Sequence, residues 1–167
     1  MAHANAQFPV ARAPGLIRMP GPLVNRLLEW GVPLGPNVLV TIRGRVSGEP
    51  RTQPIAIIGD NGRRWLAGTF GDVNWCRNLR ANPELEIRHG RRAEHLYARE
   101  LAPAEADEFF RTTLPQAIAH MPLYLKLFGR VFIRLTAGEM LTDPGLAART
   151  HPVFELIADP SATYRTA

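Results

Sequence analysis

The stretch NVLVTIRGRVSGEPRTQPIAIIGDNG, residues 37–62, decides how this chain folds. It opens with the apolar, β-branched run Asn37–Ile42, continues to a second apolar run at Thr52–Ile58, and ends in the turn sequence Gly59–Gly62. β-Branched residues favour strands, and Asp-Asn-Gly tolerates the positive φ angles of a tight hairpin. We therefore predict two strands joined by a loop, and a third strand at residues 64–68 that pairs antiparallel with the second.

The loop between the first two strands is basic and contains two glycines. It brings together three arginines, two hydroxyl side chains and two glycines: Arg43, Arg45, Arg51, Ser47, Thr52, Gly44 and Gly48. Guanidinium groups bind phosphate or carboxylate oxygens in pairs, and glycines let backbone N–H groups turn toward an anion. The pattern indicates a site for a ligand with several negative charges, and a solvated basic hairpin is the alternative. Neither a Walker A motif nor a Gly-x-Gly-x-x-Gly motif is present in this loop.

Composition favours one globular domain. The chain has 167 residues, of which 46% are hydrophobic and 21% charged, and its net charge of +5 favours anionic ligands. Nearly all the positive charge is arginine, since Lys126 is the only lysine. The single cysteine, Cys76, excludes an internal disulfide and a multi-cysteine metal site, and a reducing cytoplasm is expected.

The ends of the chain suggest the domain limits. Residues 1–15 predict a flexible arm, and residues 16–167 a single domain that begins with a short amphipathic helix over residues 23–31. The first 15 residues contain no apolar core of signal-peptide length, and no stretch reaches the roughly 18 apolar residues of a membrane span. We expect a soluble protein.

Further elements follow the first three strands. We predict a helix that Asp72 caps and that runs to Ala81, ended by Asn82-Pro83, with Trp75 and Leu79 on one face. The remaining predicted elements are strands at Glu84–Arg88 and Arg92–Leu101, a helix at Ala102–Phe110 with Pro103 in its first turn, an apolar segment at Ile118–Leu135, and a last strand at His151–Ile157. Antiparallel hairpins with inserted helices indicate a small barrel or an α+β sheet.

Four short motifs, in this order, resemble the deazaflavin-dependent nitroreductase family of split β-barrel flavin and deazaflavin oxidoreductases. They are GRVSGEPRTQP (44–54), GTFGDVNW (68–75), RNLRANP (77–83) and HPVF (151–154). The resemblance covers roughly residues 37–157. It implies an α+β, mainly β fold, a six-stranded antiparallel split β-barrel with peripheral helices. It also implies an oxidoreductase that transfers a hydride from reduced coenzyme F-420, an 8-hydroxy-5-deazaflavin, to a quinone, nitro compound or activated alkene.

The resemblance also implies which residues bind the cofactor. By motif position, the phosphate and tail carboxylates would be held by Arg45, Ser47, Gly48 and Arg51, and the linker and ring would run along Thr52, Gln53 and Pro54. Ala67, Gly68 and Thr69 would approach the deazaflavin. Trp75 and Asn78 would bring the predicted helix that ends at Ala81 to the cofactor. Val46 stands where many members have a lysine, and Arg43 is the nearby cation that would replace it.

The apolar segment at 118–135 contains candidates for the acceptor pocket. Tyr124 and Phe128 lie four residues apart, with Tyr124 as the candidate proton donor, and core packing is the alternative for Phe128. Lys126, Arg130 and Arg134 also recur at every fourth residue. That stripe suits a lid or a peripheral contact with the inner face of a membrane, and an ordinary amphipathic helix on the barrel is the alternative.

No metal site is predicted, because His89, His95, His120 and His151 have no partners at metal-ligand spacing. Cys76 is expected to pack beside Trp75. Three other functions stay open: an FMN-dependent split-barrel enzyme, a non-catalytic deazaflavin carrier, and a nucleic-acid-binding module. The last is disfavoured because aromatic residues do not alternate with the arginines as base stacking requires. The sequence leaves a monomer or a homodimer open.

Overall fold

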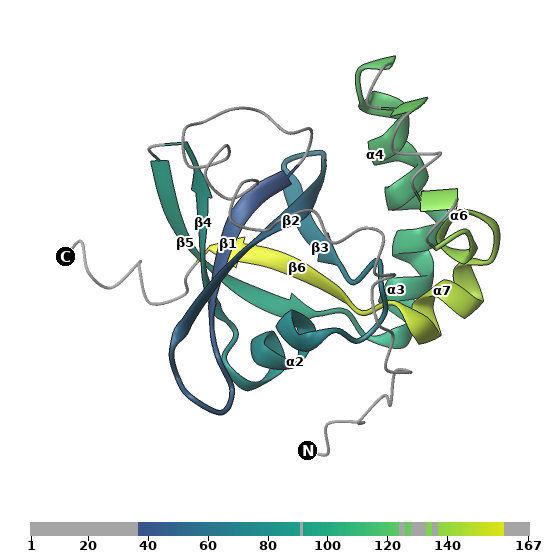
Figure 1. Cartoon of the computed structure of the whole chain (residues 1–167). Helices are drawn as coiled ribbons and strands as arrows, with labels where there is room; N and C mark the ends of the chain where they lie inside the picture. Colours follow the sequence, from purple (N-terminus) through teal and green to yellow (C-terminus); the bar gives the residue numbers. More distant parts are fainter. Residues whose placement is uncertain (1–36, 91, 124–125, 128–132, 135–136, 159–167) are drawn as a thin grey trace.

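Six strands form a closed barrel in the order β1-β2-β3-β6-β5-β4, and every neighbouring pair is antiparallel (Figure 1). The computed structural model describes residues 37–90, 92–123, 126–127, 133–134 and 137–158. The strands are β1 (Asn37–Arg43), β2 (Pro50–Asp60), β3 (Arg63–Ala67), β4 (Glu84–His89), β5 (Arg92–Glu100) and β6 (Val153–Ala158). The predicted six-stranded antiparallel barrel is confirmed.

The two hairpins of the first three strands form as their sequences predict. β1 pairs with β2 from Asn37 opposite Ala56 to Arg43 opposite Pro50, which leaves residues 44–49 as the connecting loop. β2 then turns into β3 through Asn61 and Gly62, whose φ angles are 48° and 77°. Two successive positive φ angles are those of the tight turn that matches strand twist, so the Asn-Gly pair determines this hairpin.

The barrel interior is filled by alternate residues of the strands, as the two-residue period of a strand requires. This inner core includes Val40, Ile42, Leu66, Ile87 and Phe154. One end of the barrel is closed by helix α2 (Asn74–Ala81), which places Trp75, Cys76 and Leu79 in the same core (Figure 1). The spacing of the buried residues in α2 predicted this inward face.

The start of α2 differs from the prediction. Asp72 does not cap the helix: its N-cap is Val73, with no side-chain hydrogen bond. The carboxylate of Asp72 instead accepts from Arg77 Nε at 3.0 Å and from Arg80 Nη1 at 2.6 Å. Two guanidinium groups offer a buried carboxylate stronger bonds than a single main-chain N–H, which explains the exchange. The helix ends at Asn82, before Pro83, as predicted.

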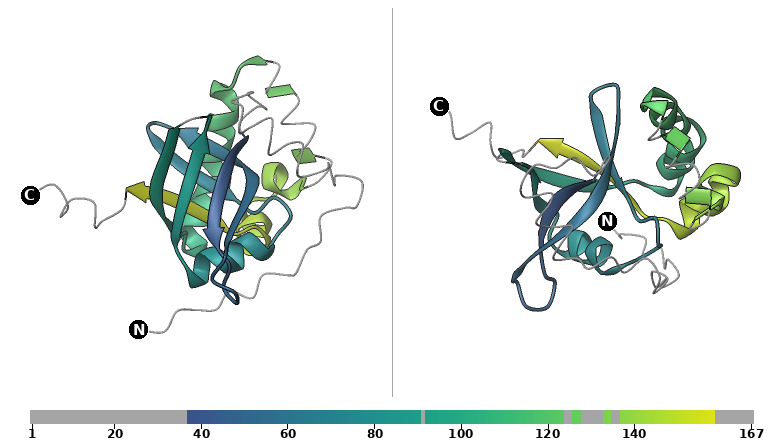
Figure 2. Two further views of the ribbon diagram at one scale, coloured as in Figure 1. Left: turned by 60° about the vertical axis from the view of Figure 1, so that its left-hand side comes forward. Right: turned by 45° about the horizontal axis from the view of Figure 1, so that its top comes forward.

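A second core lies outside the barrel, between strands β2, β3 and β6 and a layer of helices (Figure 2). The helices are α3 (Pro103–Glu108), the π-helix η2 (Phe109–Thr113), α4 (Leu114–His120), α6 (Glu139–Thr142) and α7 (Pro144–Thr150). Trp65 of β3 packs on Phe109 with ring centroids 5.6 Å apart. The outer face of these strands is therefore buried by the helices.

The helical layer extends beyond the predicted Ala102–Phe110. Residues 103–120 are helical throughout, and the π-helix at 109–113 ends two residues before Pro115. Proline has no amide hydrogen to continue an α-helical pattern, and a wider turn accommodates that loss. Helices α6 and α7 had no residue ranges predicted, and β6 begins two residues later than expected. The predicted arm at 1–15 and helix at 23–31 lie outside the described residues.

Candidate functional site

The basic loop between β1 and β2 closes on itself through main-chain hydrogen bonds. Gly44 N donates to Glu49 O at 2.8 Å, and Gly48 N donates to Gly44 O at 2.8 Å. Gly48 has a φ of 70°, a conformation that glycine adopts without strain. Ser47 Oγ accepts from Glu49 N at 3.4 Å. The loop therefore has a defined shape.

Two of the predicted anion-binding groups gather over Gly44. A Cβ atom built on this buried glycine would lie 3.1 Å from Ser47 Oγ and 3.2 Å from Arg51 Nε. The hydroxyl and the guanidinium are thus brought to one place by the absence of a side chain at position 44. The sequence predicted that this glycine turns backbone N–H groups toward an anion, but not that it leaves room for these two side chains.

Arg45 joins this loop to helix α2. The amide oxygen of Asn78 accepts from Arg45 N at 3.3 Å and from Arg45 Nη1 at 3.0 Å. Asn74 Oδ1 accepts from Arg45 Nη2 at 3.5 Å. Asn78 is 6% exposed, so it is a fixed point of the helix. The sequence predicted that the loop and α2 serve one site, and the structure brings them into direct contact.

The charges of this loop are not neutralised within the described part of the chain. Arg45 is held by neutral amides, Arg43 Nη1 donates to the carbonyl of Gly48 at 3.4 Å, and no carboxylate among the described residues pairs with Arg43, Arg45 or Arg51. Other arginines form ion pairs with Asp or Glu: Arg63, Arg64, Arg77, Arg80, Arg88, Arg99 and Arg111. Three arginines without a carboxylate partner among the described residues therefore lie at this one hairpin.

The predicted residues of β2 divide between two faces. Thr52 lies on the outer face, where its hydroxyl is 2.8 Å from that of Thr41. Pro54 shares this face, whereas Gln53 pairs with the inward-facing Val40 and has the opposite orientation. A ligand on the outside of the barrel would meet Thr52 and Pro54 but not the side chain of Gln53.

The end of β3 is more enclosed than the motif suggested. Ala67 is 8% exposed and packs in the outer core. A Cβ at Gly68 would lie 2.6 Å from Gly71 O, 3.1 Å from Pro152 Cδ and 3.2 Å from Cys76 Sγ. The glycine is therefore required by the protein's own packing. Thr69 is half-buried, so it is the most accessible residue of the three.

Trp75 is chiefly a core residue. It is 9% exposed, and its ring lies 5.7 Å from that of Phe154 in a tilted contact. Core anchoring was the alternative to a cofactor contact at this position. The buried thiol of Cys76 lies in the same core, where burial and then the charge of Asp72 raise its pKa to about 12. Such a thiol is not a nucleophile at neutral pH.

The predicted acceptor pocket falls largely outside the described residues, which exclude Tyr124, Phe128 and Arg130. Of their neighbours, Leu123 and Leu127 are exposed. Among the helices that the structure describes, none combines the length and apolar character needed to cross a bilayer. Within the same residues, no three His, Cys, Asp or Glu side chains gather as metal ligands would.

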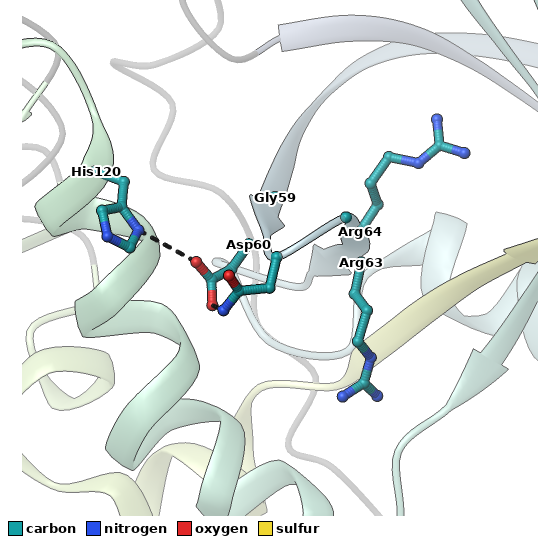
Figure 3. Close-up of a pocket in the computed structure, with 7 residues that line it drawn as sticks. Gly59, Asp60, Arg63, Arg64 and His120 are labelled. Atoms are coloured by element: carbon teal, nitrogen blue, oxygen red, sulfur yellow. Dashed lines mark hydrogen bonds and ion pairs between the residues drawn. The ribbon is translucent and has the colours of Figure 1, made fainter.

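A hollow of about 420 Å³ lies at the β2–β3 hairpin, beside the end of α4 (Figure 3). In it His120 Nδ1 is 3.2 Å from Asp60 Oδ1, and Asn61 Nδ2 donates to Asp60 Oδ2 at 3.0 Å. Arg63 and Arg64 point in opposite directions, toward Glu155 and Glu94 respectively. The basic loop lies at the other end of β2, roughly 30 Å away at the usual rise per strand residue. The hollow and the basic loop are therefore separate, and the sequence did not predict the hollow.

Comparisons with known proteins give one family match and several similar solved structures. A family model described as F-420H(2)-dependent quinone reductase matches residues 21–124. Similar solved structures include an F-420-H2 dependent reductase, FDR-A, at 25% identity, covering 72% of this chain and 93% of that chain with a TM-score of 0.46. A second structure, a domain-swapped dimer, has 25% identity, coverage of 81% and 94%, and a TM-score of 0.48. A candidate 5-nitroimidazole antibiotic resistance protein from Bacteroides thetaiotaomicron has 11% identity, coverage of 80% and 79%, and a TM-score of 0.50.

The closed six-stranded antiparallel barrel, with an arginine hairpin resting on the helix that closes it, is a split β-barrel. Because the family match spans more than half of the chain, the chain belongs to the F-420H(2)-dependent quinone reductase family. It is an oxidoreductase whose cofactor is coenzyme F-420, so the sequence-based assignment is confirmed. This assignment takes the place of the FMN and carrier alternatives.

Proposed function

We propose that this protein transfers a hydride from reduced F-420 to an electron-poor organic acceptor, with quinones as the first candidates and nitro compounds and activated alkenes as further ones. The observation that carries the proposal is the group of unpaired arginines at the β1–β2 hairpin. Family membership supports the cofactor, and the residues of this chain support where it binds.

The hairpin fits the cofactor's chemistry. Coenzyme F-420 carries a phosphodiester and a tail of several carboxylates, which need several fixed cations and hydrogen-bond donors. Arg45, Arg51 and the Ser47 hydroxyl meet this need, and the turn at Gly48 leaves backbone close to the surface. Arg43 also bonds the loop, although strand alternation places its side chain on the outer face. It supplies the cation that Val46, which is 91% exposed, does not.

The remaining predicted contacts are arranged around this anchor. We propose that Thr52 and Pro54 border the linker on the outer face of β2 and that Thr69 lies near the deazaflavin. Asn78 acts by holding Arg45, and the backbone around Ala67 and Gly68, with the edge of Trp75, bounds the ring. The side chain of Gln53 lies on the inner side of β2, so it does not border the linker on the outer face.

The chemistry that F-420 supplies when bound is a two-electron hydride transfer, which reduces a quinone to a hydroquinone when one hydride and one proton are added. The protein's part is to orient the ring and acceptor, to exclude water and to deliver the proton. Tyr124 is the proposed donor, with Phe128 beside the acceptor. Both assignments rest on the sequence.

Fluorescence titration of the purified protein with F-420 and with FMN tests the proposal. We expect tighter binding of F-420 and a fall in its affinity as salt rises, since screening weakens charge pairing. Mixing the reduced complex with a quinone should then restore the absorbance of oxidised F-420. Preference for FMN, or binding of F-420 without oxidation by quinone, nitro or alkene acceptors, would contradict the proposal.

Partners and location complete the proposal. The substrate is a small organic acceptor, and we propose no nucleic-acid partner because aromatic residues do not alternate with the arginines as base stacking requires. A cytoplasmic location suits the single buried Cys76. Size-exclusion chromatography with light scattering decides between monomer and homodimer.

A further inference from the structure

The tip of the β1–β2 hairpin, residues 46–49, contains no cation, although the hairpin as a whole is basic. The hairpin projects from the barrel beside α2 (Figure 1). Val46 is 91% exposed, so its side chain extends into solvent. Glu49 adds an exposed carboxylate, which forms no ion pair with the described residues. The tip therefore presents an apolar side chain and a negative charge to an approaching anion.

The arginines of the hairpin lie at its base, on two faces. Arg51 stands opposite Ile42 in the β1–β2 ladder, so it is on the same face as that core residue. Arg45 is bonded to helix α2. Arg43 lies on the other face, where its Nη1 donates to the carbonyl of Gly48 at 3.4 Å. Two charges thus lie toward the end of the barrel that α2 closes, and the third lies outside the barrel.

Helix α2 does not extend this group of charges, because both of its arginines are held by carboxylates. Arg77 pairs with Asp72 at 3.0 Å, and Arg80 pairs with Asp72 and with Glu100, each at 2.6 Å. The side chains of α2 that accept from Arg45 are neutral amides. Across the described surface of the hairpin and α2, the unneutralised positive charge therefore stops at the hairpin.

The number and placement of these charges limit how much of a polyanion can be held. Each guanidinium binds about one phosphate or carboxylate group, often through two hydrogen bonds. Three guanidiniums match a phosphodiester and the first one or two carboxylates of a tail. Carboxylates beyond a Debye length, about 8 Å at physiological salt, gain little from these cations. Those that pass the tip meet the like charge of Glu49.

We propose that the hairpin recognises the phosphodiester end of F-420 with at most the first carboxylates of its tail, and that the protein therefore does not distinguish short-tailed from long-tailed forms of the cofactor. Val46 and Glu49 determine this property, because they leave the hairpin tip without attraction for further glutamates. The inference rests on the proposed function, which supplies the ligand and its anchor at Arg45 and Arg51.

Fluorescence titration of the full-length protein with three ligands tests the proposal. They are F-420 with a long glutamate tail, F-420 with a short one, and the deazaflavin that lacks both phosphate and tail. The last should bind at least about tenfold more weakly, because the charge-assisted bonds are lost. The affinities for the two forms of F-420 should agree within about threefold, the size of one exposed ion pair. A larger advantage of the long tail overturns the proposal.

A cation at the tip should create the missing preference. In Val46→Lys the long-tailed form should bind about threefold more tightly than the short-tailed form, and salt should remove the difference. Glu49→Gln should change the ratio of affinities in the same direction by a smaller factor, because it only removes a repulsion. Leu146→Lys is the matched control, since it adds the same charge at a 41% exposed position of α7. An equal change of the ratio in this control would assign the effect to net charge and overturn the role of the tip.

Probes without the deazaflavin separate this inference from the proposed function. Dimethyl phosphate represents the phosphodiester, and oligoglutamate peptides of increasing length represent the tail. In NMR spectra of the cofactor-free protein, dimethyl phosphate should shift the Arg51 Nε–H resonance, and peptide affinity should not rise with length except in Val46→Lys. If neither form of F-420 binds, the proposed function is overturned, while these probes still decide what the hairpin recognises. An unmoved Arg51 resonance, or a rise with peptide length in wild type, overturns the inference even where F-420 binds.

Discussion

Asn78 accepts two hydrogen bonds from Arg45, one from the main-chain nitrogen at 3.3 Å and one from guanidinium Nη1 at 3.0 Å. A single amide oxygen thus fastens both the backbone and the charge of the hairpin to the helix that closes the barrel. Because the partner is neutral, the charge of Arg45 stays available to a ligand. A carboxylate at this position would hold the arginine equally well and cancel its charge.

The neutrality of Asn78 leads to the first prediction. Asn78→Asp keeps both acceptor bonds but adds a negative charge beside Arg45, so we expect F-420 affinity to fall by about 1–2 kcal/mol, the size of a nearby charge interaction at a protein surface. The free energy of unfolding should stay the same or rise. Fluorescence titration and urea unfolding measure the two effects, with Asn74→Asp as a more distant comparison. Unchanged affinity would show that Arg45 does not meet the cofactor's anionic groups.

Arg51 should contribute directly to cofactor binding. Arg51→Ala removes the guanidinium that lies over Gly44, and we expect a loss of about 1–3 kcal/mol in F-420 affinity, typical of a charge-assisted hydrogen bond. The matched control is Arg111→Ala, which removes an equal charge from a surface pair with Asp107 in the outer helices. If the two variants lose affinity equally, the effect is one of net charge, and Arg51 has no place in the site.

Gly68 should tolerate no side chain. In Gly68→Ala the new methyl group would lie 2.6 Å from the backbone oxygen of Gly71, so the turn must shift, and we expect a loss of about 1–3 kcal/mol in the free energy of unfolding. Gly59→Ala is the control, because its nearest atom would be 3.9 Å away. Urea unfolding compares the two. Equal stability of both variants would show that the 68–71 turn adjusts freely.

Glu155 should govern stability in acid. Burial acts to raise its pKa, but the hydrogen bonds and charges of Arg99 and Arg63 outweigh burial, so the pKa of Glu155 is lowered in the folded protein. The carboxylate therefore stabilises the fold above its unfolded pKa of about 4.5, and this contribution is lost as the pH falls toward the folded value.

Glu155→Gln tests this directly. We expect it to lower the free energy of unfolding at pH 7 by about 3 kcal/mol, because two arginines lose their charged partner. Its stability should also decline less steeply than that of wild type below about pH 4.5. Glu108→Gln, at an exposed carboxylate of α3, should behave as wild type. A parallel acid decline in Glu155→Gln and wild type would contradict the prediction.

Local sequence predicted the barrel well because strand and turn signals act over a few residues. β-Branched runs and the Asn61-Gly62 turn specify the β1–β2–β3 unit, and Pro83 ends α2 where expected. The basic hairpin was visible for the same reason, since its arginines and glycines are adjacent in the chain. Motif order then supported the family, which the comparison confirmed.

Side-chain partners were predicted less well, because they come from distant parts of the chain. The sequence predicts that Asp72 caps helix α2, but in the fold its carboxylate accepts hydrogen bonds from Arg77 and Arg80 instead. The motif predicts that Gly68 leaves room for the deazaflavin ring. In the structure Pro152, which is 84 residues further along the sequence, packs against Gly68 instead. Neither arrangement has a local signal.

The sequence by itself determined the alternation of the strands, the turns between them and the concentration of arginine at one hairpin, because each depends on neighbouring residues. Only the tertiary structure decided which arginines stay unpaired, that Asn78 holds Arg45, and that His151 bridges Gly68 and Glu139. These choices depend on which groups the closed barrel brings within hydrogen-bond distance. Barrel closure, through contacts between residues far apart in the chain, therefore fixes the basic loop on helix α2.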